Sequence, residues 1–169
     1  MEAEHKHFDI SVVGQGIAQG ASIEQCWGVL EDSAAYANWV SFFSKTELLA
    51  EGKGARNGIG SLRKFYNKEG RGILEVVNIY HRPRIYGYRV IDPDSGLKDH
   101  QGVVTLNEVA GGTELTWCMT ANNNGLFSPD SGDVFATPLD QAQGAMQAVI
   151  DITVKDLVAA CEASARQAR

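Results

Sequence analysis

Several side chains with hydrogen-bonding or proton-transfer chemistry occur in stretches that otherwise alternate like β-strands. His100 shares the parity of Val104 and Leu106 in Lys98–Asn107, so period-two alternation predicts that its imidazole points to the apolar side. There it could orient a ligand hydroxyl or carbonyl, or act as a general base, because the ordinary pKa of histidine is near neutrality. The alternative is a hydrogen-bonded or rim histidine without a chemical role, since no carboxylate or nucleophile accompanies it.

Two phenols form a second candidate group. Tyr86 and Tyr88 alternate with Gly87 and Arg89, which predicts that both rings line one wall of a cavity. The apolar residues expected beside them, on what the pattern indicates is the neighbouring strand, are Leu115, Trp117 and Met119. The phenols could bind the polar end of a ligand. Alternatively, all of these residues are core, with each tyrosine hydroxyl paired internally.

Two charges lie in the middle of predicted strands. Arg63 and Glu75 would each need a partner if they pointed inward, because burying an unpaired charge costs several kcal/mol. Arg63 precedes Lys64, which fits one charge inside and one outside, and the residues around Glu75 leave its direction open. Either could anchor a ligand, or both could face solvent.

No cofactor or metal site is expected from the remaining polar motifs. His5 and His7 lack further ligands at useful spacing, and the glycine-rich turn 51–60 lacks the Gly-Lys-Ser/Thr ending of a phosphate-binding loop. That turn is expected to be a flexible hairpin loop at one cavity mouth. The ligand pattern of a calcium loop is absent from the acidic residues Asp92, Asp94 and Asp99.

A long amphipathic helix over Pro138–Gln167 must cover these strands. Its apolar stripe follows the three-four spacing of one helical face, through Leu139, Ala142, Met146, Val149, Ile150, Thr153, Val154, Leu157, Val158 and Cys161. The sheet predicted upstream is the only large partner, so the helix should cross the concave face of a curved antiparallel sheet. This arrangement predicts a cavity between them, with Met146, Ile150 and Val104 in its lining.

The strands of that sheet are bounded by turn residues. A first strand over Phe8–Ala18, loosened by Gly14 and Gly16, precedes two short helices. Ser22 and Gln25 form a capping box for the first helix, Ile23–Glu31. Asp32 or Ser33 is expected to cap the second, through Tyr36–Trp39. The meander then runs through Thr46–Ala50, Gly60–Asn67, Arg71–Tyr80, Arg84–Ile91, Lys98–Asn107 and Thr113–Asn122, and a lid is expected over Asn122–Asp130.

Composition sets the outer limits. A chain of 169 residues, 44% apolar and 21% charged, is expected to be one α+β domain spanning residues 1–169. Its net charge of −6 argues against nucleic acid or an anionic membrane surface as a partner, and no apolar run predicts membrane insertion or a signal peptide, so we expect a cytoplasmic protein. The sequence assigns no oligomeric state. Small buried apolar roles are expected for Cys26, Cys118 and Cys161.

The chain resembles the START-related SRPBCC superfamily, which includes the birch-pollen-allergen-like proteins, and within it the polyketide cyclase/dehydrase group. The motifs that carry the resemblance are Tyr36–Trp39, Gly58–Gly60, Tyr80–Val90, Gln101–Leu106 and Gly111–Trp117. It implies a helix-grip fold, with about seven strands wrapped around the long C-terminal helix. It also implies a cavity for an apolar or aromatic molecule and no obligatory metal or nucleotide cofactor.

Besides a protein-interaction or regulatory module that uses Asn122–Asp130 as a ligand-dependent switch, which only the loop length supports, two functions follow as expectations. One is binding of a hydrophobic or aromatic small molecule, lipid or polyketide-like, in the internal cavity. The other is a cofactor-independent cyclase or dehydratase, in which His100 moves a proton with help from a cavity tyrosine or Arg63. The expected cavity lining is Arg63, Tyr86, Tyr88, His100, Val104, Trp117, Met119, Met146 and Ile150. Whether the lining is catalytic is not decided by the sequence.

Overall fold

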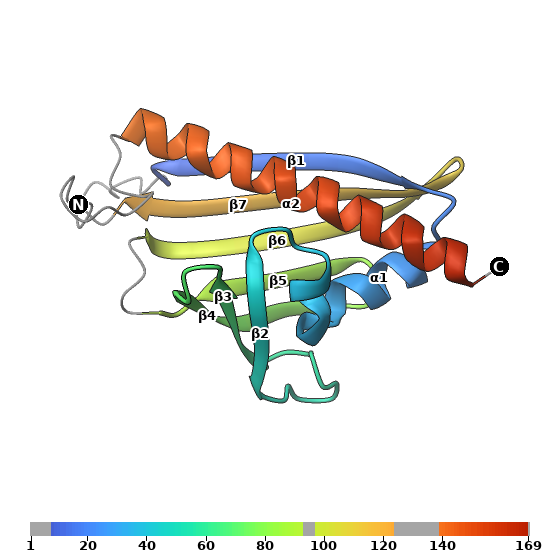
Figure 1. Ribbon diagram of the computed structural model, residues 1–169, viewed down its shortest axis with the longest axis horizontal. Helices are drawn as coiled ribbons and strands as arrows, with labels where there is room; N and C mark the ends of the chain where they lie inside the picture. Colours follow the sequence, from blue (N-terminus) through green and yellow to red (C-terminus); the bar gives the residue numbers. More distant parts are fainter. Residues whose placement is uncertain (1–7, 93–96, 124–138, 169) are drawn as a thin grey trace, which may run out of the picture.

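One antiparallel sheet and one long helix dominate the computed structural model, which describes residues 8–92, 97–123 and 139–168 (Figure 1). In these ranges the sheet has seven strands in the order β1-β7-β6-β5-β4-β3-β2. The strands are β1 (Ile10–Gln19), β2 (Phe43–Ala50), β3 (Leu62–Asn67), β4 (Gly72–His81), β5 (Ile85–Val90), β6 (Leu97–Val109) and β7 (Gly112–Asn123). The predicted α+β helix-grip fold is confirmed.

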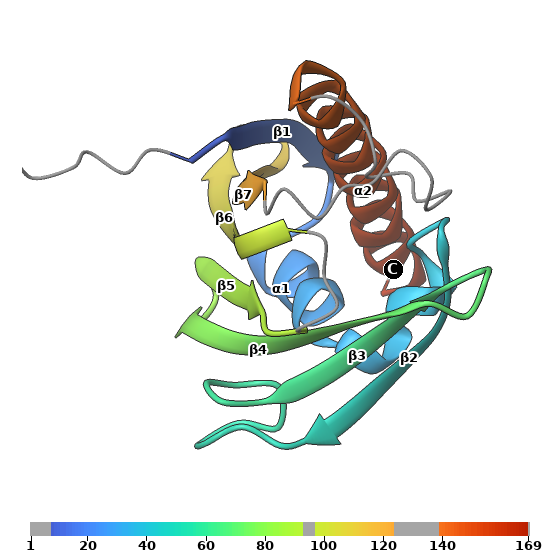
Figure 2. The same ribbon diagram turned by 90° about the vertical axis from the view of Figure 1, so that its left-hand side faces the viewer.

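The sheet curves around the helices, and α2 (Leu139–Gln167) lies on its concave side (Figure 2). The predicted stripe supplies the buried face of α2, from Ala142 through Met146, Ile150 and Leu157 to Cys161. β1 supports the helix most closely because it contains Gly14 and Gly16. A Cβ on Gly14 would lie 2.8 Å from Ile150 Cγ2, and one on Gly16 would lie 2.8 Å from Val158 Cγ2. These glycines therefore do not loosen the strand; they let the helix approach its backbone.

The outer edge of β1 is closed by side chains of α2. Gln143 accepts a hydrogen bond from the Ser11 amide at 3.1 Å and donates one to the Ser11 carbonyl at 2.7 Å. Gln147 donates to the Val13 carbonyl at 2.8 Å, and the Gln19 amide donates to Glu162 at 3.0 Å. Backbone groups that an edge strand would leave open are thus partnered within the chain.

Two short helices lie between β1 and β2, as predicted. The helix α1 (Ile23–Glu31) begins with the expected capping box of Ser22 and Gln25. The second is a 3-10 helix, η1 (Ser33–Asn38), and neither expected cap is formed there. Asp32 occupies the N-cap without a side-chain hydrogen bond, and the Ser33 hydroxyl instead donates to Asn57 Oδ1 at 2.9 Å. This bond ties η1 to the glycine-rich turn.

The cysteines divide between the core and the surface. Cys26 of α1 and Cys161 of α2 are buried, as expected, whereas Cys118 is exposed. The prediction for Cys118 was wrong because its neighbours Trp117 and Met119 take the inner face of β7, which leaves the intervening side chain on the convex face. Neither α1 nor α2 is long and apolar enough to cross a membrane.

Candidate functional site

His100 lies on the inner face of β6, as the alternation predicts. Its side chain is buried, with 9% of its surface exposed, in line with Gly102, Val104 and Leu106. Within the described part of the chain, its Nε2 atom is buried without a hydrogen-bond partner, as are Trp39 Nε1 and Ser61 Oγ. Burial lowers the pKa of His100 to about 4, so the imidazole is neutral at physiological pH. The Nε2 atom therefore belongs to a neutral imidazole and has no hydrogen-bond partner among the described residues.

Tyr88, on β5, contacts both His100 on β6 and Trp117 on β7. Its ring lies edge-on to those of His100 and Trp117, with centroids 6.2 and 6.1 Å away. The Trp117 indole donates a hydrogen bond to the Tyr88 hydroxyl at 3.3 Å. The strands that carry Tyr88 and Trp117 are β5 and β7. They are not neighbours, contrary to the expectation from sequence, because β6 lies between them. Gly102 of β6 makes the contact possible, since a Cβ there would lie 2.4 Å from the Tyr88 ring.

Arg63 and Glu75 form a buried ion pair, which settles the directions that the sequence left open. They stand opposite each other on β3 and β4, so their side chains share the inner face. Glu75 Oε2 accepts a hydrogen bond from Arg63 Nε at 3.2 Å, and it lies 3.0 Å from Arg63 Nη2 in the ion pair. Arg63 Nη1 donates to the Tyr86 hydroxyl at 3.0 Å, and that hydroxyl lies 3.2 Å from the Asn57 carbonyl, to which it donates.

Aromatic rings enclose the guanidinium. Its Cζ lies 5.1 to 5.5 Å from the ring centroids of Tyr36, Phe65, Tyr86 and Tyr88, within the range of cation–π contacts. Tyr36 and Phe65 were not among the predicted site residues. Phe65 could have been found by parity with Arg63, whereas Tyr36 comes from η1, and no strand periodicity could place it here.

The ionisation of this cluster follows from its burial. Desolvation raises the pKa of Glu75, and Arg63 opposes this effect. Desolvation alone would lower the pKa of Arg63, but the surrounding tyrosines and Glu75 outweigh it and raise the pKa, so the guanidinium stays charged. Burial also raises the pKa of Tyr86 and Tyr88, which keeps both phenols protonated.

The structure gathers the nine predicted residues in one interior. The apolar members Val104, Trp117, Met119, Met146 and Ile150 are all buried in the same hydrophobic cluster as Tyr86 and Tyr88. Tyr88 touches both the Arg63 cluster and His100, so the polar groups form one continuous array. Glu75, like Tyr36 and Phe65, was not in the predicted set. That these residues line a ligand cavity stays a prediction.

Two segments were expected at the mouth of the cavity, the glycine-rich turn 51–60 and the lid, and the structure describes only the turn in full. The glycine-rich turn 51–60 is held by Asn57, which bonds to Ser33 and accepts from Tyr86. Most of the expected lid lies outside the described residues, as do His5, His7 and Asp94. Among the described residues, no three His, Cys, Asp or Glu side chains gather as around a metal ion.

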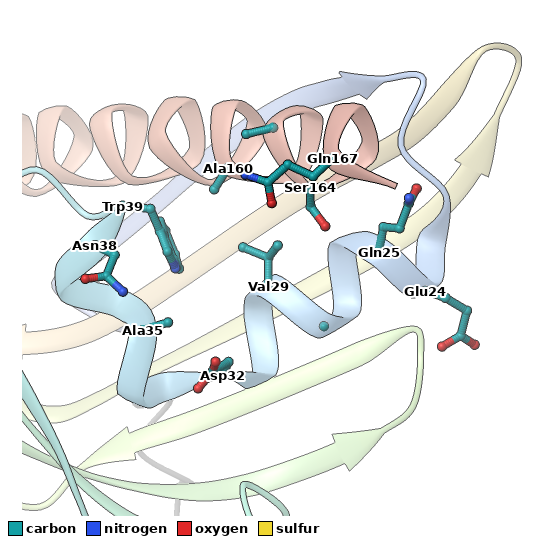
Figure 3. A pocket seen from close by; sticks show the side chains of 12 residues that line it. Glu24, Gln25, Val29, Asp32, Ala35, Asn38, Trp39, Ala160, Ser164 and Gln167 are labelled. Carbon is teal, nitrogen blue, oxygen red and sulfur yellow. The ribbon is translucent and has the colours of Figure 1, made fainter. Parts of the chain in front are cut away.

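Two grooves lie on the outside of the described structure. The larger, about 510 Å³, runs between α1, η1 and the last turns of α2, beside Val29, Trp39 and Ala160 (Figure 3). The smaller, about 320 Å³, lies between the start of α1 and the β6–β7 hairpin. None of the nine predicted residues lines either groove.

Comparison with known proteins adds a family and a set of folds. Residues 12–162 match the family model described as polyketide cyclase / dehydrase and lipid transport. No curated protein sequence matches the chain.

Solved structures match at low identity. The ZhuI aromatase/cyclase from Streptomyces sp. R1128 is 20% identical, with a TM-score of 0.69 over 94% of this chain and 95% of that one. A START superfamily protein from Mycobacterium smegmatis is 14% identical, with a TM-score of 0.65 over 94% and 99%. StfQ, a di-domain aromatase/cyclase of the steffimycin biosynthetic pathway, is 13% identical, with a TM-score of 0.72 over 95% and 52%. At these identities the likeness establishes the fold.

Proposed function

Because the chain belongs to the polyketide cyclase / dehydrase and lipid transport family, we propose that it binds a hydrophobic or aromatic small molecule between the sheet and α2. The observation that carries the proposal is the buried Nε2 of His100, which has no partner in the described structure. An unpaired buried polar atom costs about 1–3 kcal/mol, and a ligand that supplies the missing hydrogen bond would recover it.

The surrounding side chains suit such a ligand. Tyr86, Tyr88 and Trp117 present aromatic surfaces, and Met119 and Met146 are flexible apolar residues that adapt to different shapes. Apolar walls with a few convergent polar groups are characteristic of small-molecule sites. No membrane, nucleic acid or resident cofactor is part of the proposal.

Native mass spectrometry of the protein purified from its own host tests this function. We expect an additional mass at one equivalent, and organic extraction should release an apolar molecule for identification. Protein that carries no such molecule, and that also fails to bind any of a panel of aromatic and aliphatic compounds, would contradict the proposal.

A second function, a cofactor-independent cyclase or dehydratase, is favoured by the same imidazole. A neutral histidine with a free nitrogen can take a proton from the acidic carbon between two carbonyls of a poly-β-ketone. A neighbouring phenol, such as Tyr88, could donate a hydrogen bond to the enolate oxygen that forms. The enolate carbon would then form a carbon–carbon bond to a second ketone carbonyl of the chain, and the proton on His100 would pass to the alkoxide oxygen so formed, giving a hydroxyl. In a later step neutral His100 could take the remaining proton from the same carbon and return it to that hydroxyl as it leaves as water.

Turnover of a synthetic poly-β-ketone by His100→Ala separates the two functions. Catalysis predicts that turnover is lost while affinity for the unreacted compound is retained. Unchanged turnover would remove His100 from any catalytic role, and turnover absent from the wild type would leave binding as the function.

A further inference from the structure

The charges of the interior cancel. In the described structure, Arg63 is the buried cation and Glu75 the buried carboxylate. Arg63 Nε donates a hydrogen bond to Glu75 Oε2 at 3.2 Å, Nη2 lies 3.0 Å from the same oxygen in the ion pair, and Nη1 donates to the Tyr86 hydroxyl. A guanidinium engaged in this way has its charge matched before any ligand arrives.

The rest of the site is neutral as well. His100 is uncharged at pH 7, because burial among uncharged groups lowers its pKa to about 4. Tyr88, whose ring contacts that of His100, and Trp117, whose ring contacts that of Tyr88, are also uncharged there. Among the described residues of the interior, no cation is therefore left over to receive an anionic ligand group.

A bulge in β6 keeps a second cation out of the interior. Two residues of β6, Asp99 and His100, stand opposite one residue of β7, because Lys98 pairs with Asn122 and Gln101 with Thr120. Regular alternation from His100 would point Lys98 inward. The bulge instead leaves Lys98 exposed and turns Leu97, 7% exposed, into the core.

The backbone that makes this bulge is unusual. Asp99 has φ 52°, a conformation that commonly requires glycine at this position of a bulge, and its carboxylate accepts a hydrogen bond from Asn122 at 3.0 Å. Beyond the described strands, the internal segments 93–96 and 124–138 contain no lysine or arginine in the sequence.

We infer that the interior selects an uncharged ligand bearing a hydroxyl or carbonyl, and discriminates against carboxylates and phosphates. The polar group of such a ligand pairs with His100 Nε2, while its apolar body packs against Tyr88, Trp117 and Met119. A carboxylate would be desolvated there without a counter-charge, which costs several kcal/mol. This inference rests on the proposed binding function and names its ligand class.

Matched pairs of compounds test the inference at pH 7 by calorimetric titration of the wild type. The pairs are 2-naphthol with 2-naphthoate, and 1-dodecanol with dodecanoate. We expect the uncharged member of a pair that binds to do so at least about tenfold more tightly, equivalent to about 1.4 kcal/mol. Equal or tighter binding of the carboxylates would overturn the inference alone. Failure of all four compounds to bind would overturn the inference for these ligand classes, whereas the binding function fails only if native mass spectrometry and the wider panel are negative as well.

A variant that lacks the Glu75 charge makes the test of ligand charge more specific. Glu75→Gln keeps an oxygen for Arg63 but frees its positive charge, so the affinity for 2-naphthoate should rise about tenfold relative to 2-naphthol. Glu69→Gln makes the same change in net charge at an exposed turn and should leave the ratio unchanged. An unchanged ratio in folded Glu75→Gln would overturn the assignment of Glu75 as the group that cancels Arg63. If Glu75→Gln does not fold, the wild-type pairs decide the inference.

Discussion

His100 shows how burial sets the state of a titratable side chain at the residue scale. Its pKa of about 4 lies below the ordinary value of 6.5, so the unfolded chain binds more protons between these two pH values. The stability contribution of neutral His100 is therefore complete above pH 6.5 and is lost as the pH falls toward 4. We predict that this loss amounts to about 3 kcal/mol of unfolding free energy.

Denaturant unfolding at pH 7 and pH 4 measures the loss. His100→Gln removes the titration and should flatten the pH dependence relative to the wild type. His81→Gln, at an exposed position at the end of β4, serves as the control and should follow the wild type. Parallel curves for the wild type and His100→Gln would contradict the buried, neutral assignment.

Gly102 leaves the space that the Tyr88 ring occupies. Gly102→Ala places a methyl group where the Tyr88 ring lies, so the ring must move and the Trp117–Tyr88 hydrogen bond must break. We predict a loss of about 1–3 kcal/mol in unfolding free energy and an altered near-ultraviolet circular dichroism spectrum. Gly28→Ala in α1 meets open space and should be neutral or stabilising. Equal effects of the two substitutions would argue against the Tyr88 placement.

At the scale of elements, the edge of β1 gives a local prediction. The Ser11 amide bonds to Gln143, and the Gln19 amide bonds to Glu162 at the other end of the strand. Gln143→Ala should accelerate hydrogen exchange of Ser11 and leave Gln19 unchanged, while Glu162→Ala should do the reverse. Each variant controls for the other. Acceleration along the whole strand in both variants would indicate general loosening of α2 instead.

Alternation and turn residues predicted most strand positions, because each strand has one buried face. The directions of Arg63 and Glu75 were not predictable from their flanking residues. They depend on the register of β3 and β4, which the turn around Gly70, at φ 78°, fixes by pairing Tyr66 with Gly72 and Arg63 with Glu75. That register could have been inferred from the turn sequence, and it would have placed the two charges together.

Two β-bulges limited how well the side-chain directions in β4 and β6 could be predicted from the sequence. The register shift between Val77 and Ile79 in β4 changes which side chains face inward, so Tyr80 reaches Trp27 and Tyr86. The bulge at Asp99 does the same for Leu97 and Lys98. Neither shift has a glycine or proline to mark it in the sequence, and period-two reasoning fails across such positions.

For the whole molecule, the fold and family follow from pattern, whereas the ligand depends on details of the interior. The helix-grip fold and family membership are shown, and the nine predicted residues do share one interior. The charge balance of that interior could not be predicted, because it needs the Arg63–Glu75 register and the β6 bulge together. A single domain over residues 1–169 stays a prediction.

Methionine methyl NMR can show whether the ligand binds between the sheet and α2. The chain contains Met1, Met119 and Met146, and the last two are buried between the sheet and α2. With ¹³C-methyl methionine labelling, we predict that saturating 2-naphthol or 1-dodecanol shifts the Met119 and Met146 signals. Saturable binding that leaves both interior methyl signals unmoved would place the ligand elsewhere, for example in the groove beside Trp39, and would contradict the account.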